Sequence, residues 1–122
     1  MNDKRASHAI VFHQSASRVY AIGGFIKGQG CLKSCECYDI NSNKWIKMAD
    51  LNIERSKPNA FMYQNELYAF GGMTMNPKIH EFFAERYNES KNEWELLAFE
   101  GFDFPTLTGA VSLTTLPLFQ NK

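Results

Sequence analysis

Short apolar segments alternate with polar turn residues along the whole chain. One pair of such segments is HAIVFH (8–13) and RVYAI (18–22). A second pair is NAFMYQ (59–64) and ELYAF (66–70). Brief runs rich in aromatic and β-branched side chains, bounded by turn residues, are typical of strands. No segment keeps an apolar spacing of three to four residues over three helical turns. The pattern therefore predicts an all-β protein built from antiparallel hairpins.

The apolar pattern repeats with a period of 48 to 50 residues. RVYAIGG (18–24) recurs as ELYAFGG (66–72), and ECYDINSNKWIKM (36–48) recurs as ERYNESKNEWELL (85–97). Each copy contains four strand-like segments joined by connections of hairpin length. We therefore expect two four-stranded antiparallel sheets, at about 7–48 and 57–97, whose strand order follows the chain.

The order of marked residues in each copy resembles the kelch repeat, whose units are the blades of a β-propeller. The matching residues of the first copy are Arg5, Tyr20, Gly23, Gly24, Tyr38, Asp39 and Trp45. Those of the second are Arg55, Tyr68, Gly71, Gly72, Tyr87, Asn88 and Trp94. The resemblance implies one kelch repeat over 5–55, a second over 55–104, and a degenerate start of a third over 105–122. The expected fold is a kelch-type propeller fragment with two full blades and part of a third.

The repeated glycine pairs and tryptophans have structural explanations. A strand exit into a tight loop often needs a positive φ, which glycine adopts without steric cost; we expect this at Gly23 and Gly71. The segment GGFIKGQG (23–30) does not match a phosphate-binding loop, because its spacing is neither GxGxxG nor that of a P-loop. The resemblance implies that Trp45 and Trp94 pack between adjacent sheets and donate their indole N–H to the backbone.

Composition excludes several function classes. The 122 residues suffice for one ordinary domain, and 13 basic residues balance 13 acidic ones. Because nucleic-acid binding relies on excess Lys and Arg, zero net charge argues against it. No apolar run approaches the 20 or so residues of a membrane span, and no signal-peptide core follows the start, so we expect a cytoplasmic location. Residues 1–61 carry a net charge of +4 (9 − 5) and residues 62–122 carry −4 (4 − 8), an asymmetry that favours head-to-tail contacts.

Metal and enzyme chemistry have little support in the sequence. Cys31, Cys35 and Cys37 have the spacing C-x3-C-x-C, without the fourth ligand of a structural zinc site. We expect buried, reduced thiols and no metal or cofactor. No catalytic motif is present, so we expect a protein that is not an enzyme.

The kelch resemblance implies a non-catalytic module that binds a protein partner through its loops, as a substrate adaptor or a cytoskeletal binder. The candidate partner-binding residues are Arg5, Arg55, Phe25, Lys27, Met73 and Met75. Two alternatives stay open: a remnant of a kelch-type propeller enzyme of the sugar oxidase or sialic-acid epimerase class, and a truncated propeller with no independent function. Because two blades leave apolar faces uncovered, we also expect association with further kelch blades, in the same chain or in another.

Overall fold

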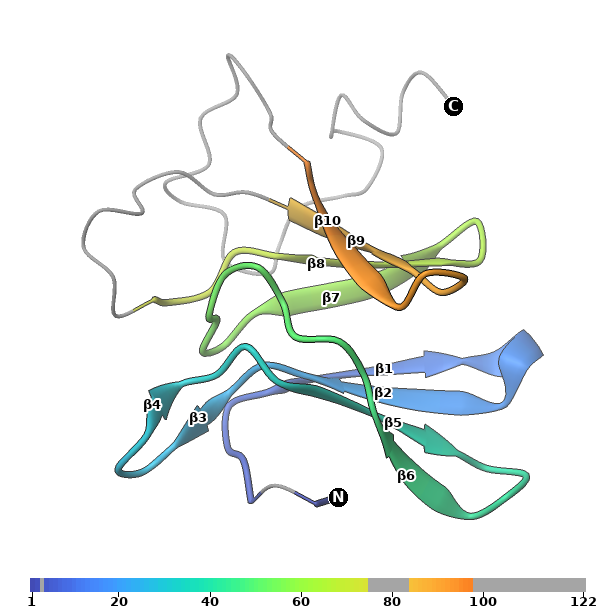
Figure 1. The fold of residues 1–122 in the computed structure, drawn as a ribbon, viewed down its shortest axis with the longest axis horizontal. Helices are drawn as coiled ribbons and strands as arrows, with labels where there is room; N and C mark the ends of the chain where they lie inside the picture. The colour runs from blue at the N-terminus through green and yellow to red at the C-terminus, as the bar shows by residue number, and fades with distance from the viewer. Residues whose placement is uncertain (3, 75–83, 98–122) are drawn as a thin grey trace.

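Two four-stranded antiparallel sheets make up the protein in a computed structural model that describes residues 1–2, 4–74 and 84–97 (Figure 1). The first sheet contains β1 (Ala9–His13), β2 (Arg18–Ile22), β5 (Cys35–Asp39) and β6 (Lys44–Lys47). The second contains β7 (Asn59–Tyr63), β8 (Glu66–Phe70), β9 (Ala84–Asn88) and β10 (Glu93–Leu97). The all-β prediction and the predicted sheets are confirmed. No helix in the described part of the chain is long and apolar enough to cross a membrane.

Strand order in each sheet follows the chain, as the repeat predicts. The orders are β1-β2-β5-β6 and β7-β8-β9-β10. A short 3₁₀ turn, η1 (Gln14–Ala16), joins β1 to β2. The β5–β6 and β9–β10 turns each place an asparagine at positive φ, Asn43 at 55° and Asn92 at 50°. Asparagine tolerates this conformation better than most other residues. This explains why an asparagine recurs at the end of each of these turns, two positions before the tryptophan.

Both glycine pairs adopt the predicted positive φ, and the first pair contacts the segment that leads into the second unit. Gly23 has φ 62° and Gly71 has φ 67°. A Cβ on Gly23 would lie 2.6 Å from the carbonyl oxygen of Arg55, and the Gly24 N–H donates to that same oxygen at 2.7 Å. The segment that leads into the second unit therefore passes directly against the glycine pair of the first. A side chain at Gly23 would block that contact.

One element lies where the sequence predicted only a loop. β3 (Phe25–Ile26) and β4 (Gly30–Cys31) pair as a small hairpin directly after the first glycine pair. The turn of this hairpin is closed by Gly28, whose φ is 91°, and by a hydrogen bond that the Gln29 N–H donates to the Ile26 carbonyl. The hairpin projects from the first sheet away from the β1–β2 turn (Figure 1).

The core lies between the two sheets, where β1 faces β7. It contains Val11, Tyr20, Ile22, Cys35 and Cys37 of the first sheet, Leu67, Ala69 and Trp94 of the second, and Met48 and Leu51 of the connecting segment.

Trp94 is buried as predicted, and its indole N–H donates to the Ala49 carbonyl at 3.0 Å. Trp45 lies half-buried on the opposite face of the first sheet, so the same expectation for Trp45 stays a prediction. The predicted third repeat, 105–122, lies outside the described residues, and the boundaries at 55 and 104 stay predictions.

Candidate functional site: repeated arginine–glutamate clusters and exposed loops

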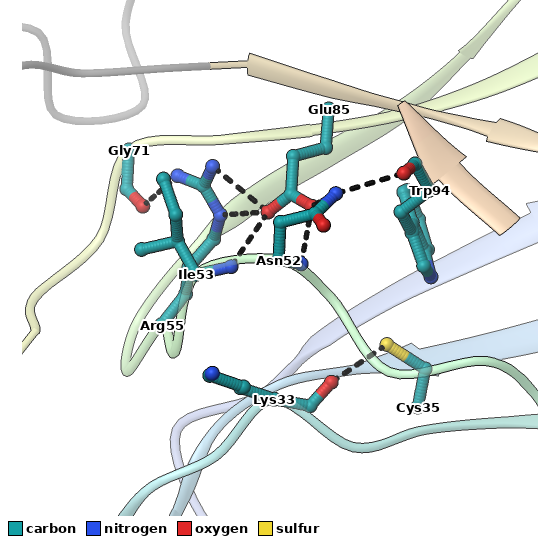
Figure 2. Close-up of polar contacts among 8 residues, drawn as sticks. All are labelled: Lys33, Cys35, Asn52, Ile53, Arg55, Gly71, Glu85 and Trp94. Carbon is teal, nitrogen blue, oxygen red and sulfur yellow. Dashed lines mark hydrogen bonds and ion pairs between the residues drawn. The ribbon is translucent and has the colours of Figure 1, made fainter. Parts of the chain in front are cut away.

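A buried ion pair joins Arg55 to Glu85 at the end of the second sheet near the glycine pair (Figure 2). Arg55 Nη2 and Nε each lie 3.1 Å from Glu85 Oε2, and both side chains are almost fully buried. Arg55 Nη1 also donates to the Gly71 carbonyl at 2.9 Å. Burial lowers the pKa of Arg55 from its ordinary value, and the neighbouring carboxylate opposes that shift. The arginine thus ties the start of its repeat to the glycine pair and to β9.

The Glu85 carboxylate organises the connecting segment as well. Its Oε1 accepts hydrogen bonds from the Asn52 backbone N–H at 2.6 Å and from Asn52 Nδ2 at 3.0 Å. Asn52 Nδ2 donates a further bond to the Trp94 carbonyl at 2.8 Å, and the Ile53 N–H reaches Glu85 Oε2 at 3.4 Å. Because a buried carboxylate needs several donors, this segment of the chain is fixed against β9 and β10.

The first repeat contains the same cluster. Arg5 Nη2 lies 3.1 Å from Glu36 Oε2, and the two side chains are 0% and 3% exposed. Arg5 Nη1 donates to the carbonyls of Gly23, at 2.8 Å, and Ser34, at 2.6 Å. The Asn2 N–H donates to Glu36 Oε1 at 2.7 Å, in the role that the Asn52 N–H has in the second repeat. The cluster is therefore part of the repeat itself. Each repeat contributes one Asn, one Arg and one Glu, at Asn2, Arg5 and Glu36 in the first and at Asn52, Arg55 and Glu85 in the second.

The two arginines are not placed where a partner could reach them. Arg5 and Arg55 were candidates for partner binding because arginine pairs well with carboxylates. In the structure each is buried and already paired with a glutamate of its own repeat. Sequence reasoning missed Glu36 and Glu85 as their partners, although both glutamates recur at the repeat spacing. We assign this arginine–glutamate pair a structural role.

The loops after the glycine pairs place the other candidates on the surface. Phe25 and Met73 are exposed by 39% and 62%, and Lys27 is exposed in the β3–β4 turn. Phe25 exchanges backbone hydrogen bonds of 2.8 and 2.9 Å with Ala6, and Met73 exchanges bonds of 2.7 and 2.8 Å with Ser56. These matching bridges hold two apolar side chains at equivalent positions of the two repeats. Met75, the remaining candidate, lies outside the described residues.

The three cysteines have unequal environments. Cys35 and Cys37 are buried, whereas Cys31 is only half-buried, so the expectation that all three are buried is wrong for Cys31. Burial raises the pKa of the Cys35 thiol to about 12, and the thiol donates to the Lys33 carbonyl at 3.5 Å (Figure 2). No group of three or more His, Cys, Asp or Glu side chains that could hold a metal ion occurs within 1–2, 4–74 and 84–97. That the protein binds no metal stays a prediction.

A polar cavity of about 370 Å³ opens between the sheets at their hairpin ends. Its lining includes His13, Tyr20, Glu66 and Arg86. The charged groups there are engaged with one another, since Arg86 pairs with Glu95 at 3.0 Å and lies 4.0 Å from Glu66.

The repeated marked residues hold the same geometry in both units. Tyr38 and Trp45 have ring centroids 5.2 Å apart, as do Tyr87 and Trp94. A four-stranded antiparallel sheet that recurs along the chain, each time with its strand order following the chain, is typical of the blades of a β-propeller. The fold therefore defines a propeller-blade protein.

Comparison with known proteins identifies the kind of blade. Residues 5–52 match the model of the kelch motif. The chain is 29% identical over 103 residues to Kelch-like protein 41a of Danio rerio. This match covers 77% of the chain and 16% of that protein. It is 33% identical over 92 residues to Kelch-like protein 38 of Rattus norvegicus, 74% of the chain and 15% of the relative. It is 28% identical over 102 residues to Alpha-scruin of Limulus polyphemus, and this match covers 79% of the chain and 11% of that relative. The chain belongs to the kelch-repeat family, and it spans between a tenth and a sixth of these relatives.

Proposed function

We propose that this kelch-repeat protein is a non-catalytic module that binds a protein partner through the loops after its glycine pairs. Similarity to kelch-like proteins and to scruin supports a role in protein interaction, as an adaptor or in the cytoskeleton. A cytoplasmic location belongs to the same proposal.

The observation that carries the proposal is the pair of exposed apolar side chains, Phe25 and Met73. Each directly follows a glycine pair, and each is held by a two-way backbone bridge to the start of its own repeat. Exposed apolar side chains on a fixed backbone are suited to anchoring a partner, because the backbone that carries them is already ordered before binding. Loops on a fixed sheet framework are also the usual carriers of recognition.

The charge around these anchors indicates the kind of partner. Lys27 is exposed in the β3–β4 turn, and Lys4, Lys33 and Lys57 are exposed on the neighbouring connections. The guanidinium groups of the repeats contribute little here, because Glu36 and Glu85 neutralise them. We expect a partner segment that combines apolar side chains with carboxylates.

A random peptide library displayed on phage tests the proposal. We expect the wild-type protein to select peptides that bind the Phe25→Ser, Met73→Ser double variant at least tenfold more weakly, which corresponds to about 1.4 kcal/mol. Ile40→Ser is the matched control, because Ile40 is similarly exposed but lies in the β5–β6 turn at the opposite end of the sheet. Peptides that bind all three proteins equally would contradict the proposal. Sedimentation with actin filaments, using the same variants, tests the cytoskeletal role separately.

A further inference from the structure

The polar cavity of about 370 Å³ lies among the β1–β2, β7–β8 and β9–β10 turns, and we call it the hairpin-end cavity. These turns lie at the end of the sheets opposite the β3–β4 hairpin (Figure 1). The cavity is therefore separate from the loops that carry Phe25 and Met73. Its volume falls in the range of about 300–1,000 Å³ that is typical of small-ligand sites, so it can hold a small molecule or a long side chain.

Aromatic and aliphatic side chains from both sheets form part of its wall. Tyr20 of the first sheet and Tyr87 of the second line the cavity, together with Met62 and Leu67. The Tyr20 hydroxyl lies 3.4 Å from His13 Nδ1, which fixes the position of that ring. Aromatic faces attract cations, and aliphatic side chains pack against the alkyl part of a ligand. The wall thus suits a ligand that has both a positive charge and an apolar stem.

The charges in the lining favour a cation. Within the described residues, the lining contains three carboxylates and one guanidinium, a balance of −2 (1 − 3). The carboxylates come from β8, the β9–β10 turn and β10, and they are Glu66, Glu89 and Glu95. The guanidinium of Arg86 lies 3.0 Å from Glu95 and 4.0 Å from Glu66. Because a carboxylate has about four lone-pair positions, these contacts leave the carboxylates able to accept further hydrogen bonds.

The negative charge acts on the cavity wall itself. Burial raises the pKa of Tyr20 and of Tyr87, and the Glu89 carboxylate raises the pKa of both phenols further. Arg18 pairs with Glu89 without lining the cavity. When Arg18 is counted as well, the local balance is still −1 (2 − 3). A cation that enters the cavity therefore meets a surplus of negative charge.

We infer that the hairpin-end cavity binds a primary ammonium or guanidinium group carried on a short alkyl chain. The alkyl chain contacts Met62 and Leu67, and the cation lies beside the tyrosine rings and the carboxylates. A free basic amine and the lysine or arginine side chain of a protein share this chemistry. The inference goes beyond the proposed function, because Phe25 and Met73 play no part in it and the two can fail independently.

Titration of the isotopically labelled full chain with butylguanidinium, followed by nuclear magnetic resonance, tests the inference. We expect the backbone signals of Asn65, Glu89 and Ser90 to shift, with a Kd of about 1 mM at low salt. Added sodium chloride should weaken the binding, because salt screens charges that are partly exposed. Butanol and butyrate are the neutral and anionic probes, and they should bind at least about fivefold more weakly.

Two substitutions remove one charge each from the lining. Glu66→Gln and Glu89→Gln should each weaken butylguanidinium binding at least about threefold. Glu54→Gln is the matched control, because it removes the same charge near the glycine-pair end, where Glu54 accepts from Thr74 at 3.1 Å. Equal weakening by all three variants, equal binding of the three probes, or no signal shift at about 20 mM butylguanidinium would overturn the inference.

Two further ligands distinguish the sources of the cation. They are putrescine, a free amine, and an end-blocked glycine–arginine–glycine peptide. Tighter binding of the peptide than of butylguanidinium supports the inference and assigns the cavity to a side chain of a protein partner. Tighter binding of putrescine supports it and assigns the cavity to a free amine. If the peptide binds no better than its glutamine counterpart and putrescine does not bind, the inference is wrong.

Discussion

Removing one partner of the buried Arg55–Glu85 pair should destabilise the protein severely. Glu85→Gln keeps the shape of the side chain but leaves the guanidinium of Arg55, whose side chain is 3% exposed, without its counter-charge. The amide group also offers a donor where the carboxylate accepted from Arg55 and Asn52. Breaking a buried ion pair on one side costs about 3–5 kcal/mol. A domain of this size has about 5–15 kcal/mol of stability in total, so the loss takes a large part of it.

Urea unfolding followed by tryptophan fluorescence and circular dichroism measures this loss. With a slope of about 2 kcal/mol/M, the expected loss lowers the midpoint by about 2 M. Glu89→Gln is the matched control, because Glu89 pairs with Arg18 on the surface, where the side chains are 61% and 35% exposed. Such a pair contributes about 0–1 kcal/mol, so its loss should shift the midpoint by less than about 0.5 M. Similar shifts in the two variants would refute the assignment of a structural role to the buried pair.

Three further outcomes follow from the structure. Gly23→Ala should cost more than Gly28→Ala in urea unfolding. Both positions have positive φ, which costs about 1–2 kcal/mol for a side chain, but only at Gly23 would the Cβ lie 2.6 Å from a backbone oxygen; equal costs would argue against the close approach. In the folded protein Cys31 should react with a thiol reagent while Cys35 stays unreactive until the chain unfolds, because burial raises the pKa of Cys35 to about 12. Rapid labelling of Cys35 would contradict its burial. Trp94→Phe should lower the free energy of unfolding by at least about 1 kcal/mol, since it removes the indole N–H that donates to the connecting segment. The equivalent substitution in the first sheet, Trp45→Phe, should lower the free energy of unfolding by less.

Local features of the sequence determined the strands, the hairpins and the repeat. Side chains alternate between two faces of a strand, so apolar alternation identifies a strand without knowledge of its neighbours. The glycine pairs were assigned positive φ because a strand exit imposes a local backbone conformation, and Gly23 and Gly71 have it. The small β3–β4 hairpin was missed, because two-residue strands carry too few side chains to show alternation.

Only the tertiary structure decided which repeated residues are available to a partner. Arg5 and Arg55 look like surface binders in the sequence, yet each meets a glutamate about 30 residues away and is buried with it. The sequence shows that a residue is charged, but only the folded chain shows which distant residue of opposite charge lies beside it. The spacing of Glu36 and Glu85 marked them as part of the repeat without indicating which side chain they would meet.

The two tryptophans illustrate the same limit. Trp45 and Trp94 occupy equivalent positions of the repeat and lie in tilted contact with equivalent tyrosines, so the sequence does not distinguish them. Trp94 is buried because the first sheet covers its face, whereas the face that carries Trp45 has no second sheet against it in the described structure. Periodicity determines which side of a strand a residue points to, and burial then depends on what packs against that side.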